Sequence, residues 1–136
     1  MQKELEQLTY YTLSKGDQNF IHQHVVDVYA AQNADPQTKP ITLFFALSGL
    51  YLLIEKNYTG KEVQAAHVKM SYRTKQFPSF DLPLQRGNIN VKDVALINDM
   101  ATKDEMIYTW CNSVWQAYAT AHDQVAELTD RLLRNS

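Results

Sequence analysis

The spacing of apolar and polar residues along the chain predicts a series of α-helices. In most segments apolar side chains recur every three or four positions, which is the period of one helix face. The clearest case begins at a capping box over Thr102–Glu105 and continues for about seven helical turns. Its apolar stripe consists of Ile107, Trp110, Cys111, Val114, Tyr118, Ala121, Val125, Leu128 and Leu132. This stripe predicts a long C-terminal helix.

Two helices are expected in the first quarter of the chain. The first covers Met1 to Leu13, and Gly16 is a natural C-terminal cap behind it. The second runs from about Asn19 to Asn33. Asp35-Pro36 ends it, because the residue before a proline avoids the α region.

The segment from Ile41 to Ile54 predicts a central, buried helix. It begins near Pro40, which suits a first helical turn, and apolar residues occur on nearly all of its sides. Gly49 lies inside it, although a glycine there costs about 1 kcal/mol relative to alanine. We therefore expect a neighbouring helix to approach closely at Gly49.

The middle of the chain predicts two more helices and a loop. Thr59–Glu62 has the spacing of a capping box and opens a helix to about Lys75. Phe77 to Asn88 holds two prolines and a glycine, and is expected to be a long ordered loop held by Phe77, Phe80, Leu82 and Leu84. Asn90–Asp93 can cap a short helix that ends near Met100. The prediction is one all-α domain over residues 1–136, a bundle of five to six helices.

Composition and charge narrow the function classes. The 136 residues are 45% hydrophobic and 21% charged, as in ordinary globular domains. The net charge of −2 argues against nucleic acid as a partner. The longest apolar stretch is shorter than the about 20 residues that a bilayer requires, and no apolar targeting segment follows the N-terminus, so we expect a cytoplasmic protein without membrane contact. A single cysteine, Cys111, fits a reducing compartment.

The first candidate site lies on the second predicted helix. His22 and His24 point about 200° apart on a helix, so they cannot hold one metal together. His24 and Asp27 are three positions apart and can touch. Such a contact could fix the imidazole tautomer for general-base chemistry. A hydrogen-bonded pair with only a structural role accounts for the same residues and is preferred.

His67 is the second candidate, on the buried side of the helix that Thr59 opens. It could meet His22 or His24 across a helix interface and complete a metal site. No HExxH or ExxH spacing occurs in the chain, so a divalent metal cofactor is not favoured and a satisfied interior histidine is preferred.

Two further groups have structural explanations that are preferred. Cys111 lies on an apolar stripe far from a helix N-terminus, which fits a small buried hydrophobe better than a nucleophile. Lys69, Arg73 and Lys75 lie near aromatic residues and could bind phosphate or single-stranded nucleic acid. Cations at a helix C-terminus, where the dipole favours them, account for the same residues.

Several sequence blocks together resemble a family of bacterial proteins known only as a domain of unknown function. They include HQHVVDxYAAQ from His22, FALxGLYL from Phe45 and WCxSVW from Trp110, and the likeness covers roughly Tyr11 to Tyr118. The resemblance implies a shared helical fold and no substrate. Broader relatives carry histidines where this chain has Asn33 and Ala46. If those histidines bind metal in the relatives, the resemblance implies that this chain has lost that site or moved it. A looser likeness, by helix order, is to DinB-type bundles, which hold a metal on three histidines.

The leading hypothesis is a helical domain with a polar pocket between the second, fourth and final helices. Its expected ligand is a small polar or anionic molecule, and its expected lining is His22, His24, Asp27, Tyr29, Gln32 and His67, with Arg86 covering it. One alternative is a DinB-like, metal-assisted transferase or hydrolase that uses His22 or His24 with His67. The other is an interaction protein without catalysis that forms a homodimer through the final helix.

Overall fold

The protein is all-α, as the apolar period predicts. A computed structural model describes residues 2–15 and 21–134. Over these ranges it contains seven α-helices, one 3-10 turn and no strand. The elements are α1 (Gln2–Ser14), α2 (Ile21–Gln32), α3 (Pro40–Lys56), α4 (Gly60–Ser71), α5 (Val91–Ala95), α6 (Met100–Ala117), η1 (Ala119–Ala121) and α7 (His122–Leu133).

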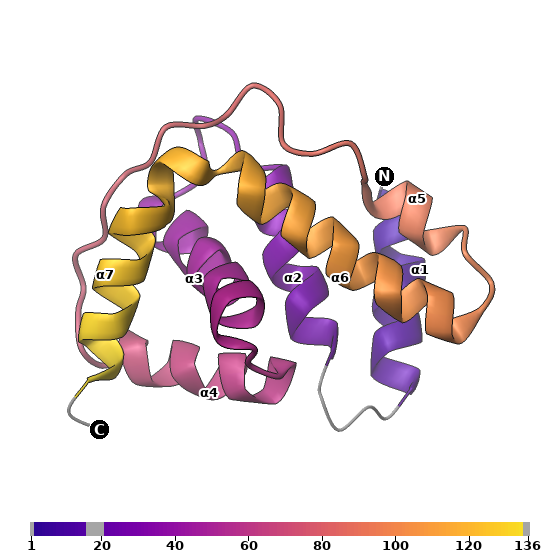
Figure 1. Ribbon diagram of the computed structural model, residues 1–136, viewed down its shortest axis with the longest axis horizontal. Helices are drawn as coiled ribbons and strands as arrows, with labels where there is room; N and C mark the ends of the chain where they lie inside the picture. The colour runs from indigo at the N-terminus through magenta and orange to yellow at the C-terminus, as the bar shows by residue number, and fades with distance from the viewer. Residues whose placement is uncertain (1, 16–20, 135–136) are drawn as a thin grey trace.

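Helix α3 occupies the centre of the fold. Pro40 stands in its first turn, and Asn57 ends it in the left-handed conformation with φ 59°. Helices α2, α4, α6 and α7 all pack against it (Figure 1). The consecutive residues Leu50, Tyr51 and Leu52 point to different sides of the helix and are all buried, which explains why its apolar residues are not confined to one face. The predicted central helix is confirmed.

Local capping signals located two helix starts correctly. The Thr59 side chain accepts a hydrogen bond from the backbone of Glu62, whose carboxylate bonds the Thr59 N–H in return. Asn90 and Asp93 form the same reciprocal pair at the start of α5. The ends were overestimated: α4 stops at Ser71 and α5 at Ala95. After Ser71 the chain enters the long loop, and after Ala95 it turns toward α6. Both helices therefore end earlier than the spacing of apolar residues indicates.

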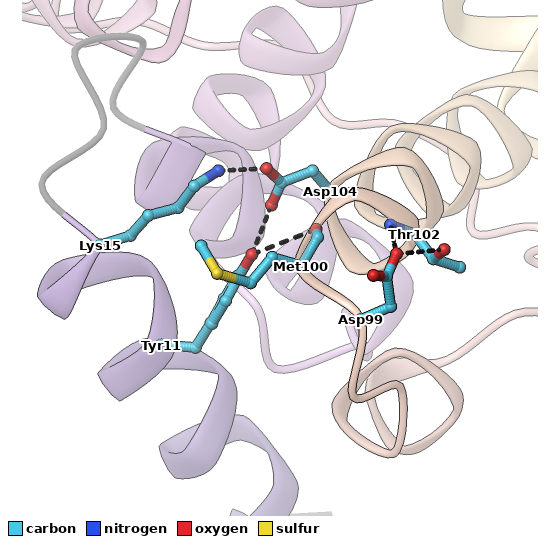
Figure 2. Close-up of polar contacts among 6 residues, drawn as sticks. All are labelled: Tyr11, Lys15, Asp99, Met100, Thr102 and Asp104. Atoms are coloured by element: carbon cyan, nitrogen blue, oxygen red, sulfur yellow. Dashed lines mark hydrogen bonds and ion pairs between the residues drawn. The ribbon is translucent and has the colours of Figure 1, made fainter.

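The start of α6 corrects another prediction. Helix α6 begins at Met100, and its N-cap is Asp99 rather than Thr102. The Asp99 carboxylate accepts from the backbone N–H of Thr102 at 2.9 Å and from its hydroxyl at 2.7 Å (Figure 2). The predicted box over Thr102–Glu105 therefore lies inside the first turns of the helix. The expected cap at Gly16 lies outside the described residues.

The predicted final helix is divided into two. After α6 the chain passes through η1 and continues as α7, which turns away to lie beside α3 and α4 (Figure 1). The bend begins at Tyr118, whose hydroxyl donates a 2.6 Å hydrogen bond to the carbonyl of Ala31 on α2. Trp110, Trp115 and Val125 are buried on either side of the bend. The stripe was therefore predicted correctly, whereas the continuity of the helix was not.

The long loop between α4 and α5 follows one edge of the molecule (Figure 1). Phe77, Phe80 and Leu82 are half-buried and pack against the apolar core, as expected. Leu84 was also expected to hold the loop, but its side chain is fully exposed, so that assignment is wrong. Among the described helices, none combines the length and the apolar character needed to span a membrane.

Candidate functional site

His22 faces the first helix. Its Nδ1 atom lies 3.1 Å from the hydroxyl oxygen of Thr12 on α1. The Thr12 hydroxyl donates its one hydrogen to the carbonyl of Thr9. It therefore accepts a hydrogen bond from His22, whose Nδ1 carries the proton. Partial burial lowers the pKa of His22. The imidazole thus ties α1 to α2.

Asp27 is buried against the central helix. Its Oδ1 atom accepts a 3.0 Å hydrogen bond from Gln23, one turn earlier on α2, and not from His24. A Cβ built on Gly49 would lie 1.9 Å from Asp27 Oδ2. The close approach expected at Gly49 is therefore real, and the approaching group is a carboxyl side chain. Burial raises the pKa of Asp27 well above its ordinary value, which the bond from Gln23 only partly opposes.

His67 packs against a ring of α3. Its imidazole stacks on Phe45, with ring centroids 5.1 Å apart and planes 12° from parallel. Its Nε2 atom is buried and has no hydrogen-bond partner in the described part of the chain. Burial lowers the pKa of His67 to about 4, against a smaller opposing effect from the backbone of Phe45. The ring is neutral at pH 7.

Gln32 and Arg86 meet at the far end of α2. The Gln32 amide donates to the carbonyls of Arg86 and Ile89 at 3.2 and 2.6 Å and accepts from the indole of Trp110 at 2.9 Å. Arg86 donates to the carbonyls of Gln32, Ala34 and Pro83. These bonds fasten the long loop to α2 and α6. Both side chains have structural partners, and Arg86 is placed over the end of α2.

The seven predicted residues thus fall into separate environments. His22 contacts α1, Asp27 contacts Gly49 of α3, His67 contacts Phe45, and Gln32 lies with Arg86. Tyr29 is half-buried against the main core. His24 alone of the seven lines the cleft described below.

This cleft lies where the start of α2, the end of α3 and the start of α6 come together. Its volume is about 290 Å³. Its apolar lining is Ile21, Leu53 and Ile107. Its polar lining is His24, Asn57, Tyr58, Thr59, Asp104 and Tyr108. An apolar wall with a few convergent polar groups is typical of small-molecule sites.

Asp104 is held in place by Tyr11 of α1 and by Lys15, which directly follows this helix. Tyr11 donates to Asp104 Oδ1 at 2.8 Å, and the ammonium group of Lys15 pairs with Oδ2. Figure 2 shows the side chains of Tyr11 and Lys15 pointing toward Asp104 on α6. Lys103 lies 4.6 Å from the centre of the Tyr11 ring, in a cation–π contact. A carboxylate fixed from two sides presents its remaining lone pairs in a defined direction.

Sequence reasoning missed most of the cleft lining. Asp104 and Tyr108 fall on the same face of α6, four positions apart, but nothing local distinguishes them from solvated residues. Asn57, Tyr58 and Thr59 belong to a short connection whose approach to α2 is set by tertiary packing. One feature of the sequence could have indicated the cleft: Tyr108 is a large aromatic side chain on the otherwise polar face of this helix.

Lys69 and Arg73 bind the C-terminal end of α7. Lys69 donates to the carbonyl of Leu133 and Arg73 to the carbonyl of Arg134, at 3.2 and 2.7 Å. Lys69 also lies in the last turn of α4, as predicted, so these cations interact favourably with the C-terminal dipole of α7 in addition to that of their own helix. Cys111 is completely buried, and burial raises the pKa of its thiol, as expected for a residue with a packing role.

No group of three His, Cys, Asp or Glu side chains that could hold a metal ion occurs among the residues described. His22, His67 and His122 face different neighbours, since His122 stacks on Trp115 with centroids 3.9 Å apart. The DinB-like alternative therefore gains no ligand set from these residues.

The fold and the cleft define a class of protein: an all-α domain with a small, mixed polar and apolar cleft between helix ends. A comparison with known protein families identifies the family to which the chain belongs. The chain belongs to the family of unknown function DUF5946, whose profile matches residues 2–119. No curated protein and no solved structure matches the chain. The predicted membership in a domain-of-unknown-function family is confirmed.

Proposed function

We propose that the chain is a binding domain for a small, uncharged polar molecule, which occupies the cleft between α2, α3 and α6. The observation that carries the proposal is the lining itself, in which three aliphatic side chains lie beside groups able to donate or accept hydrogen bonds. The volume of about 290 Å³ is at the lower limit for ligand sites, so a ligand of about one ring in size is favoured.

The charges around the cleft favour an uncharged ligand over an anion. Among the described residues that line it, Asp104 is the one acidic side chain, and Lys15 pairs with it. An anion would meet this carboxylate, whereas a hydroxyl or amide could donate to it without an electrostatic cost. Tyr58 and Tyr108 add aromatic surface for a planar body.

Three probes with one body and different charge test the proposal: benzyl alcohol, benzoate and benzylamine. Each is titrated at millimolar concentration while backbone amide shifts are recorded by NMR. We expect benzyl alcohol to shift the amides of Asn57, Ile107 and Tyr108 in a saturable way, and benzoate to shift them least. Shifts that do not saturate, or that lie outside the cleft, would refute the assignment.

Matched variants identify the site. Tyr108→Ala removes a wall of the cleft and Asp104→Asn changes its fixed acceptor, so both should weaken the binding of benzyl alcohol at least threefold. Tyr72→Ala removes an exposed tyrosine that is not part of the lining, and should leave binding unchanged. Equal affinities in all three variants would count against the cleft.

A further inference from the structure

A buried layer of side chains lies one helical turn from the cleft. On each of three helices, a residue of this layer lies three or four positions from a cleft residue, on the same face of the helix. The pairs are His24 and Asp27 on α2, Leu53 and Gly49 on α3, and Ile107 and Cys111 on α6. The packing of this layer therefore sets how the three walls of the cleft meet.

Asp27 is the ionisable group at the centre of the layer. Its side chain is 3% exposed, and Gln23 gives its Oδ1 atom a single hydrogen bond from an uncharged amide. Oδ2 has no hydrogen-bond partner within the described ranges and lies against the backbone of Gly49, where a Cβ would overlap it. An ionised carboxylate in this position would lack the donors that normally offset its loss of water.

The groups that face Asp27 from the other helices do not supply a charge. From α3 it meets Gly49, which has no side chain, and from α6 the thiol of Cys111, whose pKa the Asp27 charge raises further. On α4, which also packs against α2, the ring of His67 stacks on Phe45. On α1, Thr12 is bonded to His22. Among the residues described, burial and the Gln23 bond account for the electrostatic state of Asp27.

We propose that Asp27 is a pH-sensitive lock on the junction of α2, α3 and α6. The protonated carboxyl packs against Gly49 and keeps the junction closed, and loss of its proton opens the junction together with the cleft wall that it supports. The lock is a property of the packing and does not depend on whether a ligand occupies the cleft.

The direction of the pH effect follows from linkage. A carboxyl whose pKa is higher in the folded than in the unfolded chain stabilises the folded state at low pH. That stabilisation is fully present below the unfolded pKa, near 3.9 for aspartate, and is lost as the pH rises through the folded pKa. Between the unfolded and the folded pKa, the ratio of open to closed junction increases with pH, by up to about tenfold per pH unit, and above the folded pKa it no longer changes.

Cys111 provides a built-in reporter of opening, because it is the single cysteine of the chain and is completely buried. The rate at which it reacts with methyl methanethiosulfonate is measured from pH 5 to pH 9. Each rate is divided by the rate for urea-unfolded protein at the same pH. This ratio corrects for the pH dependence of the thiol's own reactivity. We expect the corrected rate of the unmodified protein to rise at least tenfold over this range.

Asp27→Asn retains the shape but cannot ionise, so its corrected rate should vary less than about twofold. Asp27→Ser serves the same purpose if the asparagine variant does not fold. Glu105→Gln removes an exposed carboxylate of α6 and should keep the full pH dependence. A flat profile for the unmodified protein, or equal slopes with and without Asp27, would overturn the proposal.

Discussion

Two ionisable side chains, the buried Asp27 and the half-buried His67, depart from the usual pairing of interior polar groups. Each has one polar atom without a hydrogen-bond partner among the residues described. Each is packed against a specific neighbour on α3, Gly49 for the carboxyl and Phe45 for the imidazole. Packing therefore favours the uncharged form of each group, because an uncharged group loses much less than an ion when it leaves water.

The contact between Gly49 and Asp27 leads to the first prediction. Gly49→Ala should lower the free energy of unfolding by at least about 2 kcal/mol, because the new methyl group would overlap Asp27 Oδ2. Urea unfolding measures the loss. In the double variant Asp27→Ala/Gly49→Ala the overlap is gone, so the two single effects should not add. Strict additivity would show that this overlap is not the cause.

His67 leads to a prediction on acid stability. Its pKa is lowered from 6.5 to about 4 in the folded chain, so the unfolded chain binds the proton first as the pH falls. The contribution of His67 to stability should therefore decrease from about pH 6.5 to about pH 4, by roughly 1–3 kcal/mol after allowance for solvent screening. Asp27 acts in the opposite direction, so the effect is measured as the difference from His67→Gln, which should lose this contribution. An unchanged slope in that variant, measured by urea unfolding at each pH, would assign the effect to other groups.

At the scale of elements, what could be predicted from the sequence is what neighbouring residues determine. The caps at Thr59 and Asn90 and the apolar face of α6 and α7 are local, and they were located correctly. The bend between α6 and α7 contains no glycine or proline. It coincides with the hydrogen bond from Tyr118 to Ala31, a partner 87 positions away in the sequence. Local period cannot reveal such a contact.

The candidate site shows the same division. His22, His24 and Asp27 were correctly placed on one helix, but which neighbour each one meets depends on how α1, α3 and α6 are arranged around α2. Asp104 was missed because only the approach of Tyr11 and Lys15 distinguishes it from a solvated carboxylate. The local signals therefore identified candidate residues, and tertiary packing decided which of them share a site.

The long loop is an element whose attachment can be tested. Arg86→Ala removes the donors to the carbonyls of Gln32, Ala34 and Pro83, so part of the loop should detach from α2. We expect the free energy of unfolding to fall by about 2 kcal/mol. Limited proteolysis should also cut the loop faster. Gln85→Ala changes an exposed neighbour and should do neither. Equal cleavage rates in both variants would show that Arg86 does not hold the loop.

At the scale of the whole molecule, α1 is joined to the rest of the bundle by a few polar contacts in addition to apolar packing. Helices α2 and α5 lie beside it, and Tyr11 and Lys15 connect it to Asp104 on α6 (Figure 2). Asp104 also lines the cleft. The same carboxylate thus takes part in the docking of a helix and in the proposed binding site, so the two properties should respond together when it is changed.

Asp104→Ala is therefore expected to affect stability and local opening as well as binding. The loss leaves the Tyr11 hydroxyl and the ammonium of Lys15 without this acceptor. The side chains of Lys15 and Asp104 are 17% and 28% exposed, so their ion pair is largely shielded from water. We expect a decrease of about 2–3 kcal/mol in the free energy of unfolding, at the lower end for broken ion pairs in protein interiors. Hydrogen exchange should accelerate first in α1, since its connection to α6 is lost while its apolar contacts with α2 and α5 remain. Asp81→Ala, an exposed carboxylate in the long loop, should change neither quantity. Uniform acceleration throughout the bundle would instead show that α1 has no separate opening step and that Asp104 supports the fold as a whole.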